Sequence, residues 1–348
     1  MIDLKKEKIN DDWYEFTLSN HFMSISFLNF GGIITKILVP DKYGTKENIV
    51  LCYQDYTHYE TNPLYLGAII GRVAGRIKNA TIQIQNTEYK LDQNESCHHL
   101  HGGKKGFHNV LWDFNTFQEE DGIGVTFTYT SPDGESGYPG NVNVKVTYRL
   151  TINNEFLIDY EATTDKETVL TLTNHSYFNL SGDLKNTVSD HEVTIDSSRI
   201  LKLDKDLIPF DIVEDVSETE FDFRRGKLLQ EGFVSHNEQN QLVGCGYDHY
   251  FLFDQQTANQ VIVANNDSGR IMKIKTNQPG MVMYTANGMQ EGIRLNEVKS
   301  KKYLGVCFET QAPSASLWLN DLPSITLLPN ETYKKQTIFS FDMVEKKK

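Results

Sequence analysis

Several features that would direct an interpretation at once are scarce or absent. The 348 residues include four cysteines, none spaced as Cys-x-x-Cys, so the sequence does not predict a zinc or redox motif. No apolar run approaches the roughly 20 residues needed to span a bilayer. Residues 1–16, MIDLKKEKINDDWYEF, lack the apolar segment of a secretory signal. We therefore expect a cytoplasmic protein with free thiols and no membrane partner.

Positive charge is also scarce. Lysine and arginine number 34 against 47 aspartate and glutamate residues, which gives a formal net charge of −13. Nucleic acids and anionic membrane surfaces repel a chain with this balance of charge. We therefore expect neither of them as a partner, and the charge alone indicates no ligand.

Helical periodicity is nearly absent, and the best candidate, residues 223–233, lacks a full amphipathic pattern. Alternating apolar and polar residues, which place one face of a strand in a core, are frequent instead. They occur at residues 23–27, 81–85, 124–130, 142–150, 155–162, 270–276 and 337–341. Turn-forming residues separate these segments. The pattern predicts an all-β sandwich or barrel rather than a parallel α/β sheet.

Nothing in the sequence divides the chain into parts. It has no repeat of fixed period, no low-complexity tract and no Pro/Ser-rich linker. Residues 203–223 are acidic and irregular, and we interpret them as a long surface excursion. Length alone would suggest two domains, but large all-β domains often exceed that rule. We therefore predict a single domain over residues 1–348.

Two ionisable residues follow or end apolar strands. His175 lies in TNHSYFNLSG, directly after the apolar run ETVLTL, and Glu309 lies in YLGVCFETQAPS. Each has an ordinary interpretation, because His175 could be a hydrogen-bonded core histidine and Glu309 could reach solvent. If Glu309 instead lines a cleft, partial burial would raise its pKa toward the range of a general base.

Three further residues are candidates for binding. The glycine-rich turn GRVAGRI carries Arg72 and Arg76, but it has neither G-x-G-x-x-G nor GK[ST], so a phosphate loop is not predicted. Guanidinium groups hold hydroxyls or carboxylates in fixed geometry, although a solvated arginine is the commoner outcome. Asp248, in CGYDHYFLF, is either a turn former or a site residue.

Three histidines lie within four residues in CHHLHGG (97–103), which at first suggests a metal site. In a strand, however, His99 and His101 share one face while His98 points to the other. The sequence offers no nearby carboxylate or second His/Cys cluster to complete a tetrahedral set. We therefore predict no metal site.

Taken together, these segments resemble the aldose 1-epimerase (galactose mutarotase) family. TNHSYFNL, LHGG, GYDH and FETQ follow in the family's order, and SPDGESGYPG resembles a further landmark. The similarity runs from NFGG, at residues 29–32, to the C-terminal TIFSF. The resemblance implies a large antiparallel β-sandwich with few short helices, whose open face binds one sugar without a cofactor. It also implies an isomerase of carbohydrate and galactose metabolism, as a monomer or homodimer.

The resemblance further implies roles for five residues. His175 would be the general acid that protonates the ring oxygen, and Glu309 the general base that takes the proton from the anomeric hydroxyl. Arg76, His101 and Asp248 match positions that hold sugar hydroxyls. Imidazolium and carboxylate suit ring opening, because one group must be protonated and the other not. A nearby carboxylate would also help to keep His175 protonated.

The chain departs from many relatives at three positions. Thr171 replaces Asn or Ser, Gly75 replaces Asn, and Val282 replaces a sugar-contacting Gln. The last two leave the preferred sugar open, while the expected reaction interconverts the anomers of free aldohexoses such as galactose and glucose. Two alternatives remain, because a fold does not fix a function. One is a non-catalytic sugar-binding or regulatory protein, and the other is an epimerase of phosphorylated hexoses, which would need a cationic pocket.

Overall fold

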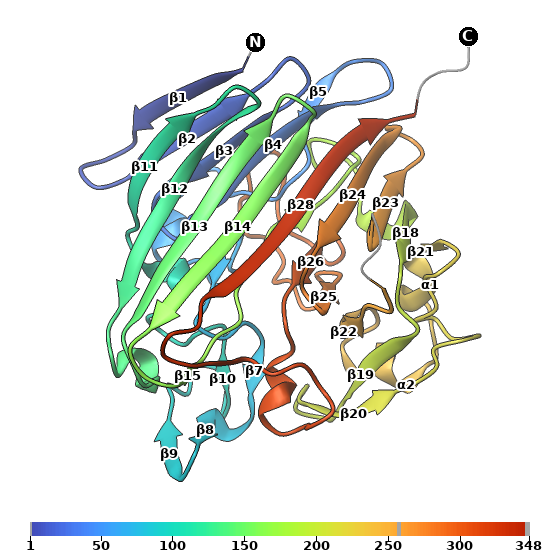
Figure 1. Cartoon of the computed structure of the whole chain (residues 1–348). Coiled ribbons are helices and arrows are strands. Elements are labelled where there is room, and N and C mark those ends of the chain that lie inside the picture. The colour runs from blue at the N-terminus through green and yellow to red at the C-terminus, as the bar shows by residue number, and fades with distance from the viewer. Residues whose placement is uncertain (1, 256–258, 345–348) are drawn as a thin grey trace.

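A computed structural model describes residues 2–255 and 259–344 (Figure 1). Antiparallel strands dominate this part of the chain, which contains only two short α-helices, α1 (Gln230–Phe233) and α2 (Glu238–Leu242). The prediction of an all-β fold with few short helices is therefore confirmed. None of the helices in these residues has the length and apolarity that crossing a bilayer requires.

The largest sheet has nine strands and forms the face turned to the viewer in Figure 1. In spatial order they are β11 (Asp113–Gln118), β12 (Gly122–Ser131), β13 (Val142–Thr151), β14 (Glu155–Thr164), β28 (Tyr333–Met343), β24 (Arg270–Thr276), β23 (Val261–Asn265), β18 (His191–Ile195) and β21 (Lys227–Leu228). Buried and exposed positions alternate along the central strands, as expected for a sheet with one face in a core. The alternating segments of the sequence coincide with five of these strands.

Two smaller sheets pack behind the large one (Figure 1). The first contains β1 (Asp3–Lys8), β2 (Tyr14–Ser19), β3 (Ser24–Leu28), β4 (Ile34–Pro40) and β5 (Lys46–Asn48). The second contains β17 (Tyr177–Phe178), β26 (Val306–Thr310), β25 (Gly280–Tyr284), β22 (Asp248–Leu252), β19 (Arg199–Leu203) and β20 (Pro209–Val213). Ring contacts join each to the large sheet, such as Phe27 with Phe127 and Phe178 with Phe339. The arrangement is the predicted antiparallel sandwich.

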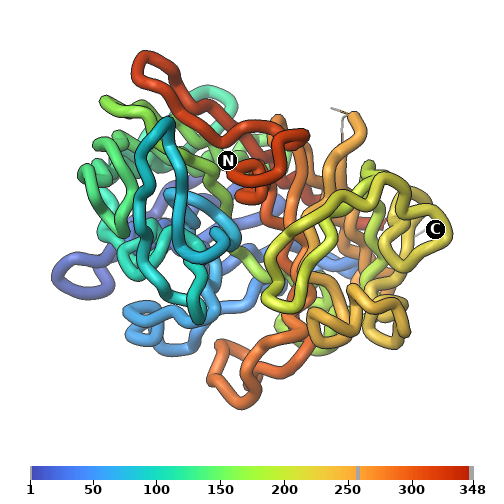
Figure 2. The backbone as a smooth tube through the Cα atoms, turned by 90° about the horizontal axis from the view of Figure 1, so that it is seen from below, coloured from blue at the N-terminus to red at the C-terminus, as the bar shows by residue number. Residues whose placement is uncertain are grey.

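Short strand pairs and single turns complete the structure. The pairs are β16 (Thr173–Asn174) with β6 (Ile69–Ile70), β10 (His99–Leu100) with β7 (Arg76–Ile77), β15 (Thr168–Val169) with β27 (Thr326–Leu327), and β8 (Thr81–Ile84) with β9 (Thr87–Lys90). The 3₁₀ turns are η1 (Tyr56–Glu60), η2 (Lys78–Ala80), η3 (Phe107–Asn109), η4 (Glu135–Gly137), η5 (Val188–Asp190) and η6 (Ser314–Leu317). Figure 2, seen from below, shows the blue-green stretch that holds β7 to β10 beside the yellow stretch that holds β19 and β20.

The interpretation of residues 203–223 as a surface excursion is wrong in part. This segment contains β20, which pairs with β19, and it buries Phe221 and Phe223 almost completely. Both rings pack against Tyr247 and Phe251 of the core. The apolar residues of this segment are few and irregularly spaced among acidic ones. The sequence therefore shows no periodic pattern that would indicate their burial.

Arg72 holds two of the sequence landmarks together. Its guanidinium, in a side chain only 2% exposed, donates to Ser131 Oγ at 2.8 Å and to the carbonyl oxygens of Ser131, Pro132 and Pro139 at 2.8–3.0 Å. Removing such partners from a buried guanidinium would destabilise the folded protein. Arg72 thus anchors SPDGESGYPG to the GRVAGRI turn and fixes the backbone that leads into Arg76.

Candidate active site

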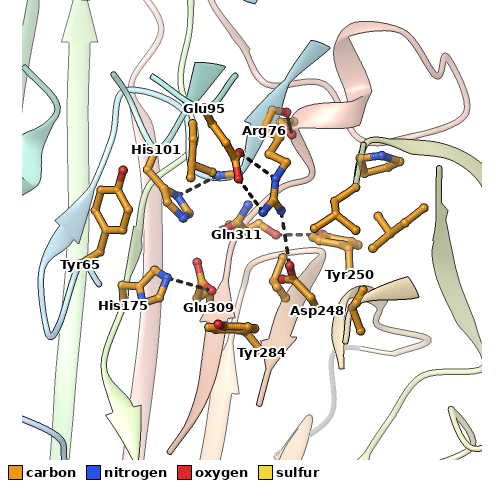
Figure 3. A pocket seen from close by; sticks show the side chains of 18 of the residues that line it. Tyr65, Arg76, Glu95, His101, His175, Asp248, Tyr250, Tyr284, Glu309 and Gln311 are labelled. Atoms are coloured by element: carbon orange, nitrogen blue, oxygen red, sulfur yellow. Dashed lines mark hydrogen bonds and ion pairs between the residues drawn. The ribbon is translucent and has the colours of Figure 1, made fainter. Parts of the chain in front are cut away.

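One cavity of about 390 Å³ opens between the six-stranded sheet and the loops that carry β7 and β10 (Figure 3). All five residues that the sequence singled out by resemblance line this cavity: Arg76, His101, His175, Asp248 and Glu309. They come from positions as much as 233 residues apart in sequence, and the pairing of the short strands with the sheet brings them together. The catalytic and sugar-binding roles of these five residues remain predictions.

His175 and Glu309 approach each other on one wall of the cavity (Figure 3). His175 Nε2 lies 3.5 Å from Glu309 Oε1, and the two residues are only 4% and 3% exposed. The backbone of His175 is fixed on both sides, because its N–H donates to Ala68 O at 2.9 Å and its carbonyl accepts from Gly67 N at 3.1 Å. Glu309 lies within the fully buried strand β26. The pair is therefore rigidly placed.

Burial dominates the titration of this pair. It lowers the pKa of His175 to about 4 and raises the pKa of Glu309 well above its ordinary value, with the charge of Asp248 raising the latter further. The other ring nitrogen of His175 faces the thiol of Cys307, with Nδ1 and Sγ 3.5 Å apart, which is a weak partner. The expectation that the carboxylate keeps His175 protonated is thus wrong for the pair alone, and the shared proton favours Glu309.

The opposite wall carries a charged cluster. Arg76 Nε donates to Glu95 Oε2 at 2.8 Å and Arg76 Nη2 donates to Glu95 Oε1 at 3.0 Å, while Nη1 lies 3.4 Å from Asp248 Oδ2. Burial raises the pKa of Asp248, and the guanidinium of Arg76 opposes that rise. A guanidinium has five N–H donors, so two remain for a ligand in the cavity.

His101 offers a donor to the cavity. Its Nδ1 accepts the backbone N–H of Gly75 at 3.2 Å, so a neutral ring carries its proton on Nε2. Burial holds the pKa of His101 well below its ordinary value, and the charges of His175 and Arg76 act in the same direction. Its ring meets those of Tyr65 and His175 edge to face, with centroids 4.8 Å and 5.2 Å away.

The three neighbouring histidines do not act as one cluster. His98 Nδ1 accepts from Asn79 N, and His99 contacts Asp92 O and the hydroxyl of Tyr138. The expectation that His99 and His101 share a strand face is wrong. Strand β10 ends at Leu100, and His101 takes a left-handed φ of 53°, which turns its ring into the cavity.

Ligand atoms of His101, His175 and Glu309 all lie within 4.8 Å of one another, so a metal ion has to be considered. A histidine that binds a metal normally donates its other N–H to an acceptor. Here Nδ1 of His101 faces the N–H of Gly75 and cannot carry a proton. The proton on His101 Nε2 opposes metal binding, and the arrangement suits hydrogen bonding and proton transfer instead.

Sequence reasoning missed several residues of the cavity. Glu95 gave no signal, because an isolated glutamate in a polar loop is ordinary. Tyr65, Tyr177 and Tyr284 also line the cavity and supply the aromatic surface that sugars commonly contact. Two of the three positions at which the chain departs from many relatives, Gly75 and Val282, line the cavity as well. A Cβ on Gly75 would lie 3.2 Å from Ser314 Oγ, and Val282 belongs to an apolar wall with Leu201 and Tyr250.

Comparison with known proteins identifies the family of the chain. Residues 14–340 match the family described as aldose 1-epimerase. Galactose mutarotase of Homo sapiens is 35% identical over 336 residues, 94% of either chain, and aldose 1-epimerase of Haemophilus influenzae is 32% identical over 311 residues, 87% of this chain and 89% of the relative. The crystal structure of galactose 1-epimerase from Lactobacillus acidophilus superposes with a TM-score of 0.87 at 30% identity, over 99% of each chain. This chain belongs to the aldose 1-epimerase family of isomerases.

Proposed function

We propose that this isomerase interconverts the α and β anomers of a free aldohexose, galactose or glucose, with His175 and Glu309 as its acid–base pair. The supporting observation is the 3.5 Å approach of His175 Nε2 to Glu309 Oε1 on the wall of a sugar-sized cavity.

The chemistry follows from the positions of the two groups. Glu309 takes the proton of the anomeric hydroxyl while His175 gives a proton to the ring oxygen, and the bond between C1 and the ring oxygen breaks. The aldehyde rotates about C1–C2, and the ring closes on the other face of C1 as both protons return. The pair carries one proton before and after the reaction, so each turnover regenerates it. Proton transfer by these two groups is sufficient, and the reaction needs neither a cofactor nor a covalent intermediate.

A bound sugar shifts the shared proton to His175. The anomeric hydroxyl donates a hydrogen bond that favours the carboxylate of Glu309, and the ring oxygen accepts one that favours the imidazolium. Arg76 opposes the raised pKa of Glu309 from the other wall. Arg76, Asp248 and the Nε2–H of His101 hold hydroxyl groups, which keeps the ring oriented between the acid and the base.

Polarimetry of freshly dissolved α-galactose tests the proposal. We expect His175→Asn and Glu309→Gln each to lower the rate about 10²–10⁴-fold, because each removes one positioned proton-transfer group. Sugar binding, measured by calorimetry, should persist. The control is Glu88→Gln, on the exposed hairpin strand β9, which should keep full turnover. Wild-type turnover in either catalytic variant would end the assignment.

The two alternatives lack support in the cavity. Both proton-transfer residues are present, which a purely sugar-binding protein would not need. A phosphorylated hexose would require a cationic pocket, whereas the guanidinium of Arg76 is already paired with Glu95 and Asp248. Rates measured on galactose, glucose and glucose 6-phosphate distinguish these functions directly.

A further inference from the structure

Glu95 has no role in the reaction just described, yet it makes the strongest contact with Arg76. The two side chains form a fork-to-fork pair through Nε and Nη2, at 2.8 Å and 3.0 Å, while the contact from Nη1 to Asp248 is longer, at 3.4 Å. Paired geometry of this kind is stronger and more directional than a single ion pair. Glu95 thus decides where the guanidinium points.

The loop holds Glu95 firmly in this position. Glu95 and His98 exchange backbone hydrogen bonds, and the side chain of Asn94 bonds both N–H and C=O of Leu100 at 2.8–2.9 Å. Leu100 in turn pairs with Arg76 across the two short strands. The carboxylate and the guanidinium are therefore presented by one connected piece of backbone at the rim of the cavity.

The ion pair between Glu95 and Arg76 changes the charge that the cavity presents to a ligand. Among the described residues that line the cavity, Arg76 is the only one with a permanent positive charge. Glu95 and Asp248 both contact it, and their side chains are 35% and 16% exposed. The guanidinium is thereby neutralised before a ligand arrives. A neutralised guanidinium donates hydrogen bonds to hydroxyl groups but gains little from an anion.

We propose that Glu95 is a positioning residue that orients Arg76 toward sugar hydroxyls and prevents it from binding anions, so that the site selects neutral aldoses over sugars with a carboxylate or phosphate. The proposal rests on the proposed function, because it assumes that sugars occupy this cavity. It explains why a site with a half-buried arginine on its wall need not accept charged sugars.

Glu95→Gln provides the test, with sulfate as a small anion that can reach Arg76 whatever the orientation of the sugar. Sulfate should compete with galactose at least about tenfold more strongly in this variant, because one negative charge near a bound anion is removed in a partly buried site. Sodium chloride at equal ionic strength corrects for screening. Calorimetric titration with sulfate gives the same comparison without any turnover.

Two variants separate charge from structure. Glu88→Gln removes a carboxylate from the neighbouring hairpin and should leave the inhibition constant of sulfate unchanged. Glu95→Asp keeps the charge but shortens the reach, so it should raise the KM for galactose, with kcat nearly constant, and still exclude sulfate. The ratio of kcat/KM for galactose to that for galacturonate should fall about tenfold in Glu95→Gln alone, for the same electrostatic reason.

The outcomes are distinct. Equal affinity for sulfate in the wild type and in Glu95→Gln overturns the inference while leaving the mutarotase assignment intact. A gain of sulfate affinity in Glu95→Asp as large as that in Glu95→Gln also overturns it, since charge would then not matter. A wild-type chain without mutarotation would instead refute the proposed function, and the calorimetric result would still decide the role of Glu95.

Discussion

At the scale of single residues, the protein places an acid and a base where neither has its ordinary affinity for protons. His175 and Glu309 are both almost completely buried, and each is penalised for carrying charge. The pair therefore holds one proton over a wide range of pH. A second proton blocks the base, and the loss of the single proton removes the acid.

This arrangement predicts a broad pH profile. The pKa of His175 is lowered to about 4, so the second proton binds only as the pH falls toward that value, below the ordinary histidine value of about 6.5. The pKa of Glu309 is raised, so the single proton is lost only well above the ordinary range of a carboxyl. We therefore expect kcat/KM, corrected for buffer catalysis, to stay constant as the pH falls past 6.5 and to decline only as it nears about 4. An acid limb centred at 6.5 would contradict this.

The resemblance of the motifs to those of the aldose 1-epimerase family predicted which side chains lie in the cavity, but not how they are charged. His175, Glu309, Arg76, His101 and Asp248 each stand in a recognisable motif. Their pKa values depend on burial by segments far away in the sequence, which no local pattern encodes. Glu95 was missed for a related reason, because only its contact with Arg76 distinguishes it from other loop glutamates.

At the scale of elements, short strands and glycine turns position many of the site residues, while the long strands form most of the large sheet. The alternation of apolar and polar residues in the sequence predicted β12, β13, β14, β24 and β28, because each of these strands is long and has one buried face. It could not reveal β7, β10 or β16, which have two residues each. These pieces are held by tight turns, where glycine is required by space and by backbone angle.

Two glycines with nearly the same φ test this point. Gly102 and Gly134 have φ of 85° and 84°, but a Cβ on Gly102 would lie 1.8 Å from Gly71 O, whereas one on Gly134 would meet nothing within 4 Å. Gly134→Ala should lower the free energy of unfolding by about 1–2 kcal/mol, the cost of a left-handed backbone. Gly102→Ala should cost about 1–3 kcal/mol more through overpacking.

The same two variants should differ in activity. Gly102 follows His101 and touches the turn that leads to Arg76, so its substitution should displace both side chains and slow mutarotation. Gly134→Ala should keep the wild-type rate. Urea unfolding and polarimetry of the two variants provide the comparison, and equal losses in both would show that the close approach at Gly102 has no effect.

At the scale of the whole molecule, one apolar core joins all three large sheets. Its buried residues run from Phe16 in β2 to Phe341 in β28 and include members of the strands on both sides of the sandwich. Three smaller clusters of buried apolar residues accompany it, and the largest of these draws on residues from Trp13 to Cys307 rather than on one segment of the chain. The continuity supports the proposal that residues 1–348 behave as one domain.

Unfolding should therefore be cooperative. We expect the urea transitions followed by far-ultraviolet circular dichroism and by tryptophan fluorescence to coincide, because loss of either smaller sheet exposes the core of the large one. Trp13, Trp112 and Trp318 lie in different parts of the structure and report on them together. Two separated transitions would show that the chain divides into independent units.

The position of β28 sets a condition on biosynthesis. Residues 333–343 lie between β14 and β24, so they join two parts of the nine-stranded sheet that are translated earlier. Until those residues leave the ribosome, the neighbouring edges of β14 and β24 have no strand between them. Unpaired edges of this kind attract other chains. Closure of the nine-stranded sheet thus depends on a strand that is synthesised after every other strand of that sheet.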